Sequence, residues 1–177
     1  VLSNPVDILT YLASDLLDLQ FQQVTGLGTH LDTIRFLSLI AQRLQVPPSQ
    51  VSALIIGEHG DSMLPVWSSA TIAGLPIDKV GGWGPAVTQE LFNRTKGSGA
   101  EVIRGKGGAG FAVGIAIRDV VHSIALDQQR ILPVSSVQNG CYGIQDVALY
   151  FPTVVGRRGI LDNHAIELWP KEMQGLR

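Results

Sequence analysis

Two apolar segments joined by a short polar stretch constrain the fold of this chain more than any other feature. Residues 51–56 form a nearly continuous apolar run, and residues 63–77 are rich in β-branched and aromatic side chains. Between them lies the sequence Gly57-Glu58-His59-Gly60-Asp61. Because glycine lets the backbone turn sharply, this pattern predicts a β-hairpin with ionisable residues near its tip. We therefore expect His59 at a strand end, in a connecting segment of the kind that carries many catalytic groups.

The rest of the chain alternates between helical and strand-like spacing of apolar residues. We expect helices over residues 5–19, 30–46, 85–104 and 110–129, and strands over residues 22–28, 130–140 and 146–156. Glycines within residues 96–100 predict a flexible break in the third helix. This order of elements favours an α+β or α/β fold, with mixed strand pairing in the second half.

The composition argues against several classes of protein. The 177 residues are 45% hydrophobic and 16% charged, with a formal net charge of -2. These values are typical of a globular chain and provide no basic surface for nucleic acid or lipid. No run approaches the roughly 18 apolar residues of a membrane span and no signal peptide is evident, so we expect a cytoplasmic protein. The lone Cys141 excludes an intrachain disulfide.

Both ends of the sequence suggest a piece of a longer protein. The chain has no initiator methionine, and residues 1–5, VLSNP, look like the end of a strand running into a turn. It stops shortly after residues 170–172, PKE, a pattern typical of the first turn of a helix. We therefore expect a fragment trimmed at both ends, with its last helix truncated.

Three ionisable residues are candidates for proton transfer and anion binding. His59 needs a carboxylate to fix its tautomer if it acts as an acid or base near neutral pH. Asp32 and Arg35 are three residues apart in the helix expected over 30–46, hence on one face. One interpretation is an ordinary surface ion pair. In the other interpretation, Asp32 orients His59, and Arg35 binds a substrate carboxylate with two hydrogen bonds.

Metal binding and phosphate binding are weaker interpretations. His30, Asp32, His59 and Asp61 form two H-x-D patterns that could hold zinc or manganese, but neither spacing is specific, and we expect no metal. None of the glycine-rich segments GLGTHL, GGWGP and GKGGAG completes a G-x-G-x-x-G loop after a strand and before a helix, and in the first of them Leu31 stands where the third glycine should be. We expect turns and close helix contacts at these glycines.

Four motifs, taken in order, carry a more specific resemblance. They are SNPVDILTYLA from residue 3, GLGTHLDTIRF from residue 26, IIGEHGDSMLPVWS from residue 55 and VSSVQNGCYGIQDVALYFPTVVGRRGI from residue 134. Over nearly its whole length the chain resembles the NAD-dependent L-lactate dehydrogenase family, and GEHGDS…PVWS favours lactate over malate dehydrogenases. The resemblance implies an α+β catalytic domain over residues 23–177, with long helices and a twisted mixed or antiparallel sheet. Residues 1–22 would then be a remnant of a Rossmann-type dinucleotide-binding domain.

The same resemblance assigns roles to four residues. His59 would give a proton to the pyruvate carbonyl or take one from lactate, and Asp32 would hold the imidazole and stabilise its protonated form. Arg35 would bind the substrate carboxylate, and Asn4 would orient the carbonyl and border the nicotinamide. The implied reaction is hydride transfer between NAD(H) and a small 2-keto or 2-hydroxy acid. A homo-oligomer, dimer or tetramer, is implied, with no nucleic-acid or membrane partner.

The chain also departs from the family pattern. Leu27 stands beside the expected nicotinamide where many members have serine, and Val113 is a further residue implied to contact the cofactor. Ala109 stands where a threonine usually lies near the substrate methyl group, so a longer 2-keto acid could fit. Most of the NAD-binding half is missing, so the isolated chain is not expected to bind NAD well or to turn over. The alternatives are a malate or broad 2-hydroxyacid dehydrogenase, or a non-catalytic interaction or oligomerisation relative.

Overall fold

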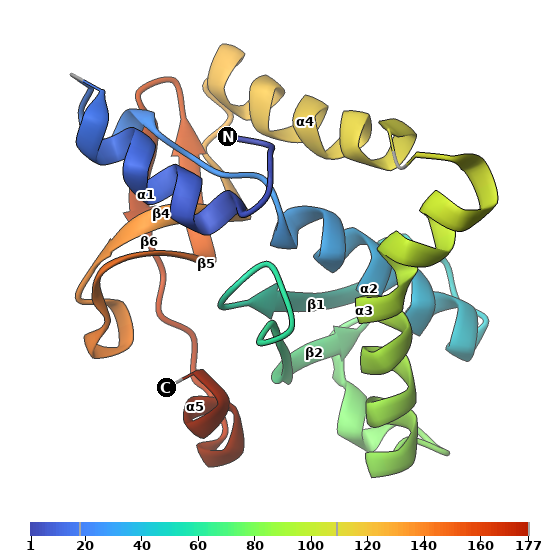
Figure 1. Cartoon of the computed structure of the whole chain (residues 1–177). Coiled ribbons are helices and arrows are strands. Elements are labelled where there is room, and N and C mark those ends of the chain that lie inside the picture. Colours follow the sequence, from blue (N-terminus) through green and yellow to red (C-terminus); the bar gives the residue numbers. More distant parts are fainter. Residues whose placement is uncertain (18, 109, 177) are drawn as a thin grey trace.

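The computed structural model describes residues 1–17, 19–108 and 110–176, which form two antiparallel three-stranded sheets with helices around them (Figure 1). The first sheet contains β1 (Val51–Ile56), β2 (Leu64–Ile72) and β3 (Leu75–Pro76), and the second contains β4 (Arg130–Asn139), β5 (Gln145–Gly156) and β6 (Gly159–Asn163). The helices are α1 (Val6–Leu16), α2 (Thr29–Leu44), α3 (Pro85–Lys106), α4 (Gly110–Ala125) and α5 (Pro170–Leu176). Short 3-10 turns lie at η1 (Phe21–Gln23), η2 (Pro48–Gln50), η3 (Ile77–Lys79) and η4 (Cys141–Gly143). This is the expected α+β architecture, with antiparallel rather than mixed pairing within both sheets.

The predicted hairpin forms the first sheet. β1 pairs antiparallel with β2, and Ile56 lies opposite Leu64, so residues 57–63 form the connecting loop. α2 packs against β1, and α3 packs against α2. Apolar residues of α2 recur every three or four positions, which gives one stripe toward the sheet. The shared core includes the fully buried residues Phe36, Ile40, Ile55, Ile77 and Leu91.

The second sheet is covered by α1 and α4 and is joined to the first by a backbone contact. β4 pairs with β5 and β5 with β6, and a core of Val120, Leu132, Val134 and Val155 lies between α4 and this sheet. The Gly57 N–H donates to the Tyr150 carbonyl at 2.9 Å, and the Tyr150 N–H donates to the Gly57 carbonyl at 2.8 Å. This isolated bridge is separate from the strand ladders of the two sheets and fixes the start of the 57–63 loop to β5.

A buried carboxylate docks the C-terminal helix α5. Glu172 is 5% exposed, and its Oε1 accepts the backbone N–H groups of Trp67 at 2.7 Å and Ser68 at 3.0 Å. Its Oε2 accepts the backbone N–H of Trp169 at 2.8 Å. Because an ionised carboxylate can accept several hydrogen bonds, one side chain joins α5 to β2.

The strand expected over residues 22–28 is absent. The segment forms the 3-10 turn η1 and then a single backbone pairing between Gly26 and Ser135. A Cβ atom at Gly26 would lie 2.9 Å from the Ser135 Cβ and would also overlap the Thr10 hydroxyl. The segment therefore passes tightly between α1 and β4, where it can form one bridge but no ladder.

The helix break expected over residues 96–100 is also absent, because α3 is continuous from Pro85 to Lys106. Leu91 and Thr95 are buried on α3 and anchor it against its neighbours. Tertiary packing therefore overrides the low helix propensity of Gly97 and Gly99. Within the described ranges, no helix combines the length and apolarity that crossing a bilayer requires.

Candidate active site

Asp32 is the centre of the candidate site. It lies in the first turn of α2, where the helix dipole favours negative charge, and its side chain is nearly fully buried. Its Oδ2 is 2.6 Å from His59 Nδ1, and its Oδ1 accepts a hydrogen bond from Arg35 Nη1 at 3.3 Å. Thr33, the next residue, accepts the backbone N–H of Ile55 on its hydroxyl at 3.0 Å. This bond ties the start of α2 to the strand that leads to His59.

His59 presents one edge of its imidazole to Asp32 and the other outward. An ionised carboxylate can only accept hydrogen bonds, so Nδ1 carries the proton and donates to Asp32 Oδ2. Nε2 makes no hydrogen bond to any residue that the structure describes, and the side chain is 22% exposed. The hydrogen bond and charge of Asp32 raise the pKa of His59 above 6.5, although burial opposes the rise. The ring is therefore held for proton exchange at Nε2.

The backbone at His59 is also closely packed, by residues that the sequence did not point to. A Cβ atom at Gly28 would lie 2.7 Å from both Cβ and Cγ of His59 and would overlap the Tyr150 hydroxyl, so only glycine fits there. The backbone N–H of His59 donates to Asp7 Oδ2 at 2.9 Å. The G-L-G sequence before α2 was the only available signal for Gly28, and it also fitted an ordinary turn.

The Arg35 guanidinium lies next to a glycine of α3. The Arg35 side chain is 15% exposed, and a Cβ atom at Gly99 would lie 3.5 Å from Nη1. The contact with Asp32 uses only Nη1 of the guanidinium, which carries further N–H donors. The two interpretations of Asp32 and Arg35 are thus not exclusive, since Asp32 contacts Arg35 and His59 at the same time.

The other residues expected at the site are placed less directly. Asn4 is exposed and lies just before α1, three residues from Asp7. Leu27 is half-buried and packs against the α4 and second-sheet core, and Val113 is half-buried on α4. The position of Ala109 lies outside the described residues.

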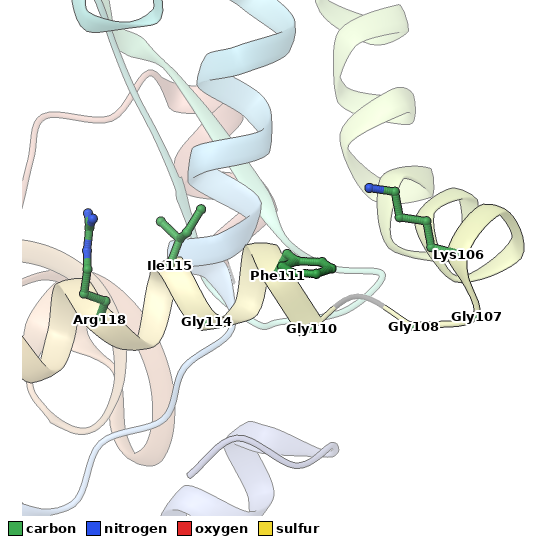
Figure 2. A pocket seen from close by; sticks show the side chains of 8 residues that line it. All are labelled: Lys106, Gly107, Gly108, Gly110, Phe111, Gly114, Ile115 and Arg118. Carbon is green, nitrogen blue, oxygen red and sulfur yellow. The ribbon is translucent and has the colours of Figure 1, made fainter.

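A surface hollow of about 660 Å³ lies apart from this site, where α3 ends and α4 begins. Figure 2 shows Phe111, Ile115 and Arg118 projecting from one side of α4, with Lys106 across the glycine-rich connection. Among the described residues, its lining contains neither a histidine nor a carboxylate, so the hollow offers no counterpart to the Asp32–His59 pair.

The two H-x-D patterns do not converge. His30 Nε2 is 3.3 Å from Asp119 Oδ2 on α4, while His59 contacts Asp32. Among residues 1–17, 19–108 and 110–176, no group of three or more His, Cys, Asp or Glu side chains is arranged to hold a metal ion. The arrangement that the described residues do form is an oriented imidazole beside a half-buried guanidinium. It can exchange a proton next to a bound anion.

Comparison with known proteins gives consistent matches along the chain. Residues 29–177 match the family model for the lactate/malate dehydrogenase alpha/beta C-terminal domain. An L-lactate dehydrogenase from Synechococcus sp. (strain JA-3-3Ab) is 44% identical over 99% of this chain and 58% of its own length. The L-2-hydroxycarboxylate dehydrogenase (NAD(P)(+)) of Methanocaldococcus jannaschii is 41% identical over 100% of this chain and 57% of its own length. A minor L-lactate dehydrogenase from Enterococcus mundtii has a similar structure, with a TM-score of 0.95, 36% identity, and 99% and 57% coverage. The chain thus spans a little over half the length of these relatives.

Proposed function

The chain belongs to the lactate/malate dehydrogenase family, and from this premise we propose that it is the catalytic part of an NAD-dependent L-2-hydroxyacid dehydrogenase. The preferred substrates in this proposal are pyruvate and L-lactate. The observation that carries the proposal is the Asp32–His59 contact of 2.6 Å beside Arg35. An oriented imidazole next to a guanidinium is what the reduction of a 2-keto acid needs, because the substrate brings both a carbonyl and a carboxylate.

His59 moves the proton in this mechanism. With Nδ1–H donating to Asp32, protonated His59 can give the Nε2 proton to the carbonyl oxygen, and neutral His59 can take it from the hydroxyl of the 2-hydroxy acid. The negative charge of Asp32 stabilises the imidazolium form, so His59 remains a usable acid near neutral pH. Keto-acid reduction therefore uses the protonated form of the enzyme, and hydroxy-acid oxidation uses the neutral form.

Arg35 binds the substrate carboxylate, and Asn4 orients the carbonyl. The guanidinium fork can make two parallel hydrogen bonds to a carboxylate, which fixes the substrate plane relative to His59. Gly99 of α3 lies beside the guanidinium, where a Cβ atom would be in ordinary van der Waals contact with Nη1 at 3.5 Å. Asn4 is proposed to lie at the substrate because it is exposed and is three residues from Asp7, which contacts the His59 backbone.

The described residues fit only part of an NAD molecule. The nicotinamide supplies the hydride when the cofactor is bound, and Asn4, Leu27 and Val113 are the residues proposed to contact it. Leu27 and Val113 are half-buried apolar side chains, so each can offer a surface to a flat ring. The G-x-G-x-x-G spacing of residues 105–110 begins in the last turn of α3 rather than after a strand, so it does not form the dinucleotide-binding loop for the phosphates.

The division of the chain into two parts also belongs to this proposal. We propose that residues 1–22 end a dinucleotide-binding domain and that residues 23–177 form the substrate-binding domain. This division is supported by an exposed apolar surface on α1, where Ile8 is 60% exposed and Leu16 is 77% exposed. A homo-oligomer is the expected assembly.

A broader substrate range is the second candidate. It is favoured by the 41% identity to an enzyme named L-2-hydroxycarboxylate dehydrogenase. Ala109 also favours a broader range, because it is smaller than the threonine usual in lactate dehydrogenases. The two candidates differ in the ratio of kcat/KM values for pyruvate, 2-ketobutyrate and oxaloacetate. A strong preference for pyruvate would reject the broader one.

The deciding experiment is NADH oxidation by the longest gene product that contains these 177 residues. We expect turnover with pyruvate, and we expect His59→Asn to lower kcat by roughly 10²- to 10⁴-fold while NADH binding is retained. His122→Asn is the matched control, because His122 is exposed on α4, and it should leave kcat unchanged. Failure of the unmutated protein to bind NADH or any 2-keto acid would overturn the proposal in favour of a non-catalytic interaction role.

A further inference from the structure

Asp7 makes two hydrogen bonds that join three distant parts of the chain. It lies in the first turn of α1, and its Oδ2 accepts the backbone N–H of His59 at 2.9 Å. Its Oδ1 accepts the hydroxyl of Ser135, on β4, at 2.7 Å. One carboxylate thus connects α1, the 57–63 loop and the second sheet.

Both of these contacts favour the ionised form of Asp7. Partial burial raises the pKa of the Asp7 carboxyl, while the hydrogen bonds from Ser135 and the His59 backbone act in the opposite direction. If Oδ2 were protonated, it would become a donor facing the His59 N–H, whereas a protonated Oδ1 could still donate to the Ser135 hydroxyl, which also accepts hydrogen bonds. Ionised Asp7 satisfies both partners and places a negative charge close to His59.

The electrostatic surroundings of His59 come from several elements. The charged groups that act on His59 or Asp7 are Asp32 and Arg35 of α2, Asp7 of α1 and Glu58 of the loop, while Tyr150 of β5 is itself affected by Asp7 and Asp32. Asp32 and Asp7 both favour the imidazolium, while Arg35 disfavours it. Glu58 acts on Asp7, and its Oε2 accepts the Ser62 hydroxyl within the same loop.

We propose that Asp7 is a positioning residue for His59, which holds the backbone of the histidine while Asp32 holds its ring, and which adds a second negative charge beside it. The effect of Asp7 on catalysis rests on the proposed function, whereas its effect on the position and protonation of His59 does not. Two anchors restrict the imidazole more than one, because Asp32 holds only the ring and the Gly57–Tyr150 pairing fixes only the start of the loop. The backbone of Gly28 also packs closely against the Cβ of His59.

The position of Asp7 in the chain gives this anchor a further consequence. Asp7 follows Asn4 by three residues, with Pro5 and Val6 between them, and Val6 is buried. The segment that presents Asn4 is therefore attached, through Asp7, to the backbone of the proton donor. A shift of that segment moves both the proposed carbonyl-orienting amide and the histidine.

Two substitutions separate the charge of Asp7 from its hydrogen bond. Asp7→Asn keeps an acceptor for the His59 N–H and removes the charge, whereas Asp7→Ala removes both. In the 177-residue chain, NMR titration of the His59 ring should show a lower midpoint in Asp7→Asn than in the unmutated chain. In Asp7→Ala, exchange of the His59 amide hydrogen should be at least about tenfold faster than in the unmutated chain. Asp15→Asn, at an exposed position of α1, should change neither quantity.

The longest gene product supplies the activity readout. Asp7→Ala should lower kcat by about tenfold with KM changed by less than about threefold, and Asp7→Asn should recover part of this loss. An unchanged midpoint in Asp7→Asn together with unchanged His59 amide exchange in Asp7→Ala would overturn the proposal. If Asp7→Ala does not fold, the Asp7→Asn midpoint decides. A shifted midpoint in a protein that shows no turnover would support the positioning role and reject the proposed function.

Discussion

α2 contributes one partner to each of two histidine–aspartate pairs, and the two pairs are built differently. The distance between His59 Nδ1 and Asp32 Oδ2 is 2.6 Å, whereas the distance between His30 Nε2 and Asp119 Oδ2 is 3.3 Å. The His59 side chain is 22% exposed, and that of His30 is 7% exposed. Asp32 shares its charge with Arg35, and Asp119 shares its charge with Arg118 at 2.8 Å and Arg130 at 3.7 Å.

These differences move the two histidines in opposite directions. Burial lowers the pKa of His30, and the hydrogen bond and charge of Asp119 only partly oppose that effect. For His59 the hydrogen bond that it donates to Asp32 outweighs burial, and the pKa of His59 rises. Residue type is the same in both pairs, so the length of the contact, the burial of the ring and the neighbouring charges, Arg130 for His30 and Asp7 for His59, decide the direction of the pKa shift. A histidine near a carboxylate is a proton donor only where its other nitrogen can reach a substrate.

Substitution of the two aspartates should break the comparison most strongly. Asp32→Asn keeps the shape but neither fixes the tautomer of His59 nor stabilises its protonated form, so kcat/KM for pyruvate should fall by roughly 10²- to 10⁴-fold. Asp119→Asn, in the other pair, should stay within about threefold of the unmutated enzyme. Steady-state NADH oxidation by the longest gene product measures both. Equal losses in the two variants would contradict the assignment of catalysis to Asp32.

Substitution of the two arginines should give a smaller effect, on KM. Arg35→Lys replaces a planar fork by a point charge and loses one of two charge-assisted hydrogen bonds, worth about 1.5–3 kcal/mol. We therefore expect a KM for pyruvate roughly 10- to 100-fold higher, with kcat changed less. Arg130→Lys, beside Asp119, is the matched control and should leave KM unchanged. An unchanged KM in Arg35→Lys would remove Arg35 from the substrate site.

The pH dependence of stability should show the smallest effect and the clearest contrast in sign. The pKa of His59 is raised on folding, so its contribution to stability is complete below about pH 6.5 and is lost as the pH rises through the folded value. The pKa of His30 is lowered, so folding loses stability as the pH falls from about 6.5 through its folded value. His59→Gln should therefore cost most stability at low pH, and His30→Gln should reduce the loss at low pH.

Urea unfolding of the 177-residue chain between about pH 5 and pH 9 measures both slopes. The exposed His122→Gln variant serves as the reference for the general effect of removing a histidine. Parallel curves for His59→Gln and His30→Gln would show that the two pairs are electrostatically equivalent, which would contradict the comparison.

Much of the fold could be predicted from the periodicity of apolar residues. The hairpin around residues 57–63 and the helices now seen as α2 and α4 follow from local patterns that tertiary contacts reinforce. The errors came where distant parts of the chain decide local structure. Gly99 looks like a helix breaker in isolation, yet it lies inside α3 against the Arg35 guanidinium. Gly26 looks like part of a strand, yet close approach by α1 and β4 restricts it to one bridge.

The same limit applies to the candidate site. Asp32, Arg35 and His59 were predicted because their residue types and spacing suggest chemistry, and the structure places them in contact. Asp7 and Gly28 were missed, because Asp7 contacts His59 across 52 positions and Gly28 matters only for the volume that it leaves empty. Neither property can be read from a local pattern. The sequence also offered no way to distinguish His30 from His59 by burial.

The backbone pairing of Gly57 with Tyr150 has a consequence for the order in which the molecule folds. The hairpin of β1 and β2 is local and can close early, since its strands are neighbours in the sequence. Its tip reaches β5 only after a long loop has been closed, at a large cost in chain entropy. Since α2 packs against β1, early closure of the first sheet brings Asp32 close to His59, whereas the contacts of His59 with Asp7 and of Gly57 with Tyr150 need segments more distant in the sequence. We therefore expect the backbone anchors of the histidine to form after the Asp32–His59 pair.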